Sequence, residues 1–304
     1  MKSLLVVCLL CAPALADPPG ASEHARLELA PAGHAFKQLQ IENPLGDVRV
    51  EGYDGTAIMI ETHKQAPDDD TLERLRVSLV PNPDGSVRIT TAADHTAESR
   101  PVPRSAVRID LVIRAPRGAH VDATVAGGKL EVSNMDGGGE LDSASGPLSV
   151  HNVSGELVTN TVSGPMSLAQ VFGSVDAATV SADLDLDSIA GEKLIASANH
   201  GRIAGRRVRA RDVELTTTDG KITLEAEASL RGHLVVSSLR GDVEVHLHRH
   251  GAVLLRARGT KVDLGQTVRP QPNGWSETMI GQGDHPALVE LRSTYGMVQF
   301  TVVE

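Results

Sequence analysis

Aromatic side chains and cysteines are scarce in this sequence of 304 residues. Phe, Trp and Tyr together make up 2% of the chain, and its two cysteines, Cys8 and Cys11, both lie within the first sixteen residues. If those residues are removed as a signal peptide, no disulfide can contribute to stability. The core must instead be built from Val, Leu, Ile and Ala, which suits a thin, repetitive interior.

The first sixteen residues have the pattern of an export signal. Lys2 precedes the apolar run 4–10, and Ala14-Leu15-Ala16 is the small-residue pattern that signal peptidase cleaves. We therefore expect residues 1–16 to be a signal peptide, cut between Ala16 and Asp17. The mature protein would then be exported to the periplasm, the cell surface or the extracellular space.

Basic residues are outnumbered by acidic ones. The sequence contains 29 Lys and Arg against 39 Asp and Glu. Removing Lys2 with the signal leaves 28 against 39, a net charge of about −11. This balance argues against nucleic acid as a partner, because nucleic acid binding depends on cationic side chains. No later apolar run approaches the roughly 20 residues of a membrane helix, so we do not expect the mature chain to span a membrane.

Sequence motifs of catalysis are absent as well. The chain has no Gly-x-Ser-x-Gly elbow, no phosphate-binding loop and no His-Glu-x-x-His, and its predicted mature form has no cysteine nucleophile. Polysaccharide-acting β-helix enzymes place paired acids in a cleft, usually with aromatic platforms, whereas the acids here are spread along strands. We therefore predict a non-enzymatic protein with no catalytic residues and no cofactor, and keep such an enzyme as a less favoured alternative.

Glycines recur at a fixed step of eighteen residues in the middle of the chain. Between them apolar residues alternate with polar ones, as at Leu184 and Leu186, which is the period of a strand with one buried face. A unit of eighteen residues cannot bury that face alone, so successive units must stack. Two glycine series define the step: Gly137, Gly155, Gly173 and Gly191, and Gly128, Gly146 and Gly164.

This pattern predicts an all-β fold. The favoured architecture is a β-solenoid, a β-helix-like stack of roughly 18-residue coils with an N-terminal β cap. A β-sandwich made of hairpins is the alternative. Within the cap, Asp70 and Glu73 fit a capping box, which predicts a short helix after Asp70.

The same pattern predicts the domain organisation. We expect one β-repeat domain, because glycine-paced strands continue on both sides of every loop. The expected segments are an exposed N-terminal segment at 17–35 and the domain at 36–304, divided into the cap at 36–116 and the repeat coils at 117–304.

One segment and two short motifs carry a resemblance to a known family. The segment VRIDLVIRAPRGAHVD at 107–122, followed by glycine-paced strands, resembles the bacterial putative-adhesin family DUF4097, and the likeness covers residues 36–304. The motifs Gly46-Asp47-Val48 and Gly241-Asp242-Val243 are similar to those in the head domains of autotransporter adhesins. The resemblance implies a β-helix-like fold and an adhesive or envelope role, with an unidentified envelope or cell-surface ligand, and it supplies no catalytic residues.

Three carboxylates alternate with leucines in one predicted strand. Asp183, Asp185 and Asp187 would form an outward row of oxygen ligands, which predicts a calcium site between coils. One coil later, Arg202 and Arg206 occupy the positions of Asp183 and Asp187. Ion pairs between coils are therefore the competing interpretation, and the one that we favour.

Two further clusters are candidate sites. Glu244, His246 and His248 share one strand face, a spacing from which zinc or copper could be bound. The competing interpretation is an exposed row that gains charge as the pH falls below about 6.5. A basic cluster could meet phosphate or carboxylate groups, although a solvated face explains it as well; its members are Arg206, Arg207, Arg209 and Arg211.

Two functional classes remain after these exclusions. The first is an adhesin or structural envelope module that presents a binding surface. The second is a periplasmic module that binds or senses a ligand or an ion. Retention inside the outer membrane would distinguish the second from the first.

Overall fold

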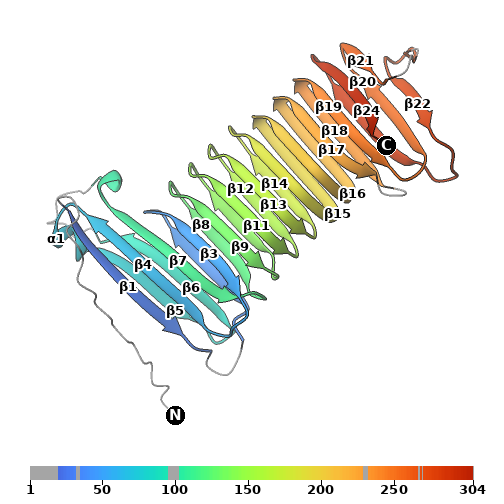
Figure 1. The fold of residues 1–304 in the computed structure, drawn as a ribbon. Helices are drawn as coiled ribbons and strands as arrows, with labels where there is room; N and C mark the ends of the chain where they lie inside the picture. Colours follow the sequence, from blue (N-terminus) through green and yellow to red (C-terminus); the bar gives the residue numbers. More distant parts are fainter. Residues whose placement is uncertain are drawn as a thin grey trace. The chain divides into compact units, whose positions relative to one another are not determined.

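The computed structural model describes residues 20–31, 35–94, 103–228, 232–265, 268 and 270–303, and most of these are in β-strands (Figure 1). The chain divides into two compact units, unit 1 at Met1–Ser149 and unit 2 at Val150–Glu304. The predicted signal peptide at 1–16, with its cleavage site between Ala16 and Asp17, lies outside the described residues.

Unit 1 contains ten strands, one short α-helix and a 3-10 helix among its described residues. They are β1 (Ala21–Leu29), β2 (Gln38–Asn43), β3 (Val48–Tyr53), β4 (Ile58–Ala66), α1 (Asp69–Leu72), β5 (Leu75–Pro81), β6 (Ser86–Ala93), the 3-10 helix η1 (Arg104–Ala106), β7 (Arg108–Pro116), β8 (His120–Val125), β9 (Leu130–Met135) and β10 (Gly139–Ser143).

The strands of unit 1 form two faces. On one face β1 lies antiparallel to β4 and β4 antiparallel to β7, after which β7, β3 and β9 run parallel. On the other face β5 lies antiparallel to β6, and β6, β2, β8 and β10 run parallel. Antiparallel strands thus begin each face and parallel strands follow, which is the N-terminal β cap that the sequence predicts.

One detail of the cap differs from the prediction. Helix α1 exists, but its N-cap is Asp68, whose carboxylate accepts a hydrogen bond from the Thr71 amide at 2.7 Å, so the capping box at Asp70 is wrong. Hydrogen bonds from Thr71, first from its side chain and then from its amide, lower the pKa of Asp68. Residues 21–29, part of the N-terminal segment expected to be exposed, pair with β4 as strand β1, and most of their side chains are exposed.

Unit 2 contains the remaining strands, and β11 begins two residues before its boundary. They are β11 (Leu148–Ser154), β12 (Leu157–Thr161), β13 (Met166–Phe172), β14 (Val175–Thr179), β15 (Leu184–His200), β16 (Ile203–Asp219), β17 (Ile222–Ala228), β18 (His233–Arg240), β19 (Val243–Arg249), β20 (Val253–Arg258), β21 (Lys261–Asp263), β22 (Ser276–Ile280), β23 (Ala287–Ser293) and β24 (Met297–Val303).

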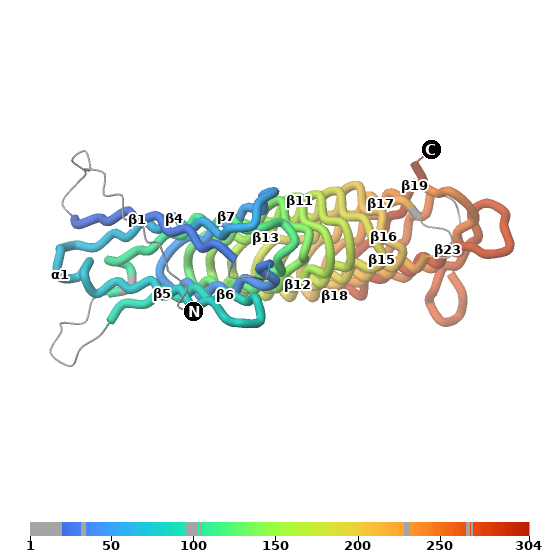
Figure 2. Tube along the Cα trace, turned by 90° about the horizontal axis from the view of Figure 1, so that it is seen from below, coloured from blue at the N-terminus to red at the C-terminus, as the bar shows by residue number. Residues whose placement is uncertain are grey.

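Each coil of unit 2 supplies one strand segment to each of two faces (Figure 2). The first face contains β13, the first half of β15 and the first half of β16, followed by the whole of β17, β19 and β24. All of these segments run parallel. The second contains β12, β14, the second halves of β15 and β16, β18 and β23, also parallel. The side chains that point between the faces are buried aliphatics such as Leu168, Leu186 and Ile203.

The register of these pairs confirms the eighteen-residue coil. Leu157 pairs with Val175, eighteen residues on, and Met166 pairs with Leu184 at the same step. The step grows to nineteen from Leu184 to Ile203. Among the described residues of unit 2, antiparallel pairing is confined to β20 with β22. The fold is therefore a parallel β-solenoid, and the alternative of a sandwich of hairpins is wrong.

A bulge recurs once per coil on the face that contains β13. There two outward residues, rather than one, separate successive buried residues, and the second has a left-handed backbone with φ between 51° and 59°. Asn tolerates that conformation better than most residues with a side chain. The bulge ends at β17, where the pairing with β16 shifts between Gly205 and Val208. The left-handed residues are Asn134 in unit 1 and Asn152, Gln170, Ser188 and Arg207 in unit 2.

Glycines at one corner of unit 2 stack too closely for any side chain. A Cβ on Gly220 would lie 1.9 Å from the carbonyl oxygen of Gly201, and a Cβ on Gly241 would lie 1.9 Å from that of Gly220. Buried hydroxyls next to the corner add hydrogen bonds, since Thr217 donates to the Gly201 carbonyl and Ser238 to the Gly220 carbonyl. Contact between neighbouring backbones therefore explains this part of the glycine period.

Candidate functional site

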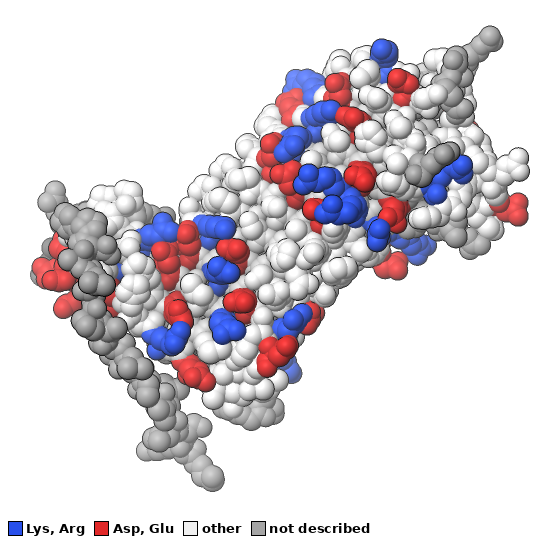
Figure 3. All heavy atoms as spheres, in the orientation of Figure 1, with Lys and Arg blue, Asp and Glu red and all other residues white. Residues whose placement is uncertain are grey.

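Charged side chains gather on the outward side of β15, β16, β17 and β19 in unit 2, where blue and red groups lie close together (Figure 3). We call the outward surface of these four segments the charged face. Because the strands are parallel and in register, a side chain on one coil lies next to its counterpart on the following coil. The charged face is thus a set of ladders that run from coil to coil.

The predicted acidic row occupies this face and is engaged by arginines of the next coil. Arg202 Nη2 donates to Asp185 Oδ1 at 3.0 Å, and its Nε lies 3.7 Å from Asp183 Oδ2. The Arg202 amide also donates to Asp183 Oδ1 at 2.8 Å. Asp187 forms an ion pair with Arg207, whose Nε donates to Ser188 Oγ at 2.9 Å. All three carboxylates therefore have cationic partners.

The bulge changes which arginine meets Asp187. The register places Arg206 opposite Asp187, as the sequence predicts, but the ion pair is made by Arg207. Because Arg207 has a left-handed backbone, it and Arg206 both point outward. Among the described residues Arg206 has no acid within ion-pair distance, whereas Arg209 pairs with Glu227 and Arg211 with Glu192. The basic cluster is thus largely neutralised by neighbouring coils.

The predicted histidine cluster lies on β19 of the same face. Glu244 pairs with Lys221 at 2.6 Å, and its other oxygen lies 3.1 Å from Nε2 of His246. His248 turns instead to the preceding coil, where its Nε2 lies 3.5 Å from Glu225 Oε1. The pKa of Glu244 is lowered, chiefly by the hydrogen bond from Lys221 and then by that from His246. The three side chains of the cluster therefore do not converge on one point: Glu244 pairs with Lys221 and His246, whereas His248 lies beside Glu225.

These pairings bear on the two metal predictions. Within the described residues, no group of three or more His, Cys, Asp or Glu side chains is arranged to hold a metal ion. The calcium site at Asp183, Asp185 and Asp187 stays a prediction. Zinc or copper at Glu244, His246 and His248 stays a prediction in the same way.

A second ladder runs along the glycine corner. Arg240 donates two hydrogen bonds to Asp219 of the preceding coil, and His200 of the coil before that lies 3.0 Å from the same carboxylate. The pKa of Asp219 is lowered, mainly by the hydrogen bond from Arg240, with a smaller effect of His200. Three successive coils are joined through one carboxylate.

Unit 1 carries its own titratable groups on β1, β4 and β7 and in the connection between β2 and β3. Arg108 bridges Asp47 and Asp110, with nitrogen–oxygen distances of 2.6 and 2.8 Å, and these bonds raise its pKa. His24 and His63, a cross-strand pair, stack with ring centroids 3.9 Å apart. Sequence reasoning missed this pair, because its members are far apart in the chain and have no shared motif.

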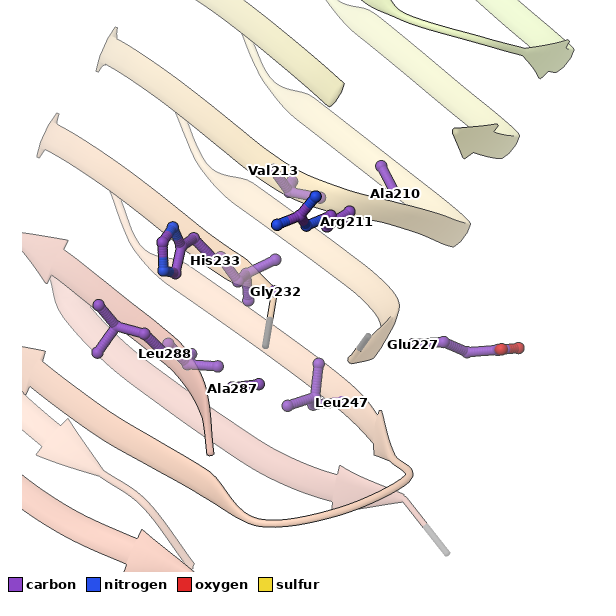
Figure 4. A pocket seen from close by; sticks show the side chains of 11 residues that line it. Ala210, Arg211, Val213, Glu227, Gly232, His233, Leu247, Ala287 and Leu288 are labelled. Carbon is purple, nitrogen blue, oxygen red and sulfur yellow. The ribbon is translucent and has the colours of Figure 1, made fainter. Parts of the chain in front are cut away.

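A small pocket lies beside β16, β18 and β23 (Figure 4). Arg211, Glu227 and His233 contribute polar groups, and Ala287 and Leu288 form part of its apolar wall. Its volume is about 10 Å³, which is room for at most one water molecule. Ligand pockets are typically about 300–1,000 Å³, so this pocket is not a small-molecule site.

Beside the charged face lies a surface with no charged group, which sequence reasoning missed. We call it the uncharged strip: the outward residues of β13 and of the part of β11 in unit 2. A sequence signal was present, because Glu156 is the only Lys, Arg, Asp or Glu between Asp142 and Asp176. In Figure 3 the surface over these strands is mostly white. The strip consists of His151, Asn152, Ser154, Ser167, Ala169, Gln170 and Phe172.

The stacked coils and their ladders define a parallel β-solenoid with paired surface charges. A family model described as Toastrack DUF4097 matches residues 36–262, and the chain belongs to this family. The resemblance inferred from the sequence is thereby confirmed. No curated protein matches the chain. None of the helices in its described part has the length and apolar character needed to span a bilayer.

Solved structures show a looser likeness. A putative adhesin from Parabacteroides merdae is 12% identical, with a TM-score of 0.45. A putative lipid binding protein from Parabacteroides distasonis is 11% identical, with a TM-score of 0.43. A putative adhesin from Bacteroides fragilis is 12% identical, with a TM-score of 0.40. Each comparison covers 93% of this chain and 97% of the other. At such scores the likeness carries no argument about function.

Proposed function

We propose that this chain is an exported, non-enzymatic protein of the cell envelope that presents its outward strand faces as a binding surface, in the manner of an adhesin or a structural module. The proposal includes removal of residues 1–16 as a signal peptide and a mature protein that begins at Asp17. The partner would be a ligand of the envelope or of another surface.

The observation that carries the proposal is the form of the described surface. Its strands are stacked in parallel and its charges are paired between coils, as with Arg202 and Asp185 or Arg240 and Asp219. The pocket at β16, β18 and β23 has room for at most one water. Such a molecule offers extended faces to a partner rather than a cleft to a substrate.

Localisation is the test. The protein is followed in intact cells that are treated with an external protease, with a known periplasmic protein as the control for membrane integrity. Degradation of this chain while the control survives, together with weaker attachment of a deletion strain, is the expected result.

A second strain keeps this test interpretable. In it an arginine replaces Leu5 or Leu9 within the apolar run of the predicted signal, so the protein should accumulate in the cytoplasm and fail to restore attachment. Protection of the wild-type protein from external protease would instead favour the periplasmic binding or sensing module. A wild-type protein found in the cytoplasm would refute both.

A further inference from the structure

We propose that the uncharged strip around Phe172 binds a neutral polysaccharide. This inference rests on the proposed function, because it names the chemistry of the partner that the presented surface would hold. Four features of the strip support it: an exposed aromatic ring, the lack of charge, the supply of hydroxyl and amide groups, and a narrow shape.

Phe172 is the anchor of the strip. Its side chain is 50% exposed in a chain with only six aromatic residues. It pairs with Ala190 of the next coil, and its carbonyl accepts a hydrogen bond from the amide of Gly155, which places Ser154 on its other side. Because both neighbours are small, the ring face remains available. A rigid, exposed aromatic face is the kind of group on which binding energy concentrates.

The other exposed aromatic side chain in unit 2 has different surroundings. Tyr295 is 70% exposed, but it lies at the glycine corner, where its amide donates to the carbonyl of Leu239. The next residue on that coil is Arg240, which holds Asp219. A partner at Tyr295 would meet this ion pair, whereas a partner at Phe172 meets small and neutral side chains.

The composition of the strip indicates the charge of the polymer that it could bind. It contains no Lys, Arg, Asp or Glu, so it offers neither cations to an acidic polymer nor acids to a basic one. Its polar groups are hydroxyls, amides and one imidazole, which donate and accept hydrogen bonds. Each sugar hydroxyl both donates and accepts hydrogen bonds, so a surface with donors and acceptors can satisfy it. The strip itself contains no carboxylate with which to cleave a glycan. Asp185 and Asp187 flank it on β15, but Arg202 and Arg207 hold them in ion pairs.

The dimensions of the strip favour a chain molecule over a protein. Seven residues along two strands span about 20 Å by 10 Å, from the usual strand rise and spacing. That area is on the order of 200 Å², about a quarter of what each partner buries in a stable protein interface. A single polysaccharide chain lying along the strands needs no wider surface.

Affinity electrophoresis of the purified protein through gels containing polysaccharides tests the proposal. The neutral probes are dextran, mannan and hydroxyethyl cellulose, and the acidic probes are alginate and polygalacturonate. We expect retardation by at least one neutral probe. Phe172→Ala should weaken it about tenfold or more, as loss of an aromatic anchor does. Phe172→Tyr should retain it.

Two controls accompany these variants. Val162→Ala removes an exposed aliphatic side chain, 54% exposed, from a different part of the same coil. Arg206→Ala removes the arginine that has no acid partner among the described residues of the charged face. Both should bind like the wild type, and thermal melting of each variant confirms that it is folded.

Several outcomes would overturn the proposal. They are no retardation by any neutral probe, retardation by acidic probes alone that Arg206→Ala abolishes, or unchanged binding of Phe172→Ala. Self-association that Phe172→Ala removes, seen by sedimentation velocity, would assign the strip to a second copy of the chain instead. In cells, a Phe172→Ala protein that reaches the surface and restores attachment fully would refute this inference but leave the proposed function standing. Absence of the wild-type protein from the envelope would refute the proposed function itself.

Discussion

The Cα of Gly220 lies so close to the backbone of Gly201 that an added Cβ would be 1.9 Å from the Gly201 carbonyl oxygen. Gly220→Ala should therefore force the two coils apart and lower the free energy of unfolding by about 1 to 3 kcal/mol, as overpacked sites do. Urea denaturation measures this change. Gly118→Ala is the matched control, because its Cβ would have no atom within 4 Å, and it should be neutral or slightly stabilising. Equal losses in both variants would contradict the stacking.

The left-handed backbone of Gln170 predicts opposite effects of glycine at two adjacent positions. Gln170 has φ of 55°, which a Cβ disfavours, so Gln170→Gly should raise the free energy of unfolding by about 0.5 kcal/mol. Ala169 lies beside it in the same strand without a left-handed backbone, and Ala169→Gly should lower that free energy by about 0.5 to 1 kcal/mol. Chemical denaturation of the two variants side by side tests the bulge, and a loss in both would argue against it.

Arg202 and Arg206 should differ in their contribution to stability. Arg202 pairs with Asp183 and Asp185, whereas Arg206 has no acid within ion-pair distance among the described residues. Arg202→Ala should cost about 0.2 to 1 kcal/mol at low salt, and less at high salt because surface charges are screened. Arg206→Ala should cost nothing measurable. Chemical denaturation of both variants at low and high salt measures these changes. A larger loss of unfolding free energy in Arg206→Ala than in Arg202→Ala would contradict this assignment.

Calcium should not change the melting temperature. Asp183, Asp185 and Asp187 are already paired with Arg202 and Arg207, so an ion would have to displace those guanidinium groups. A ligand that binds only the folded state raises the melting temperature, so scans in excess calcium and in excess chelator should coincide. A rise in calcium that Asp185→Asn abolishes would show that the calcium site predicted from the sequence exists.

Asp219 should make stability depend on pH at the acid end. Its pKa is lowered from the ordinary value of 3.8, chiefly by Arg240. A carboxyl whose folded-state pKa is depressed stabilises the fold above its unfolded value, and this contribution is lost as the pH falls through the folded value. The difference in melting temperature between wild type and Asp219→Asn should therefore be largest near neutral pH and shrink below about pH 4.

Asp176→Asn is the control for this measurement. Asp176 is exposed on β14, and no ion pair of this residue is found among the described residues. Its melting-temperature difference from the wild type should stay the same over the same pH range. A parallel change in both variants would assign the effect to net charge rather than to the pairing with Arg240.

The coil and its two faces were predictable from the sequence because glycine spacing and the alternation of apolar residues are local signals. The step of eighteen residues between Met166 and Leu184 follows from them directly. The ion pairs were only partly predictable. Counting residues places Arg206 opposite Asp187, but the bulge at Arg207 moves the pairing by one position. A left-handed backbone at Arg has no sequence signal, although Asn134 and Asn152 at the same step gave a hint.

Other features depend on contacts between distant residues. The buried amide of Asn43 donates to the carbonyl of Ile109 and accepts from Thr91, a network that no local pattern shows. The uncharged strip was recoverable from the near absence of charged residues between Asp142 and Asp176. The small neighbour of Phe172 on the next coil, Ala190, could be identified only from the register of β13 against β15.

The regular step of the coils also limits how this chain can change in length. An inserted or deleted residue within β12 to β14 would turn every later side chain of that coil to the wrong face and move its corner glycine away from the one beneath it. Removal or duplication of a whole eighteen-residue coil keeps both relationships, because Leu157 already pairs with Val175 across that distance. Length variation that is tolerated in this region should therefore occur in whole coils, and a family member could become longer or shorter without any change to its cap.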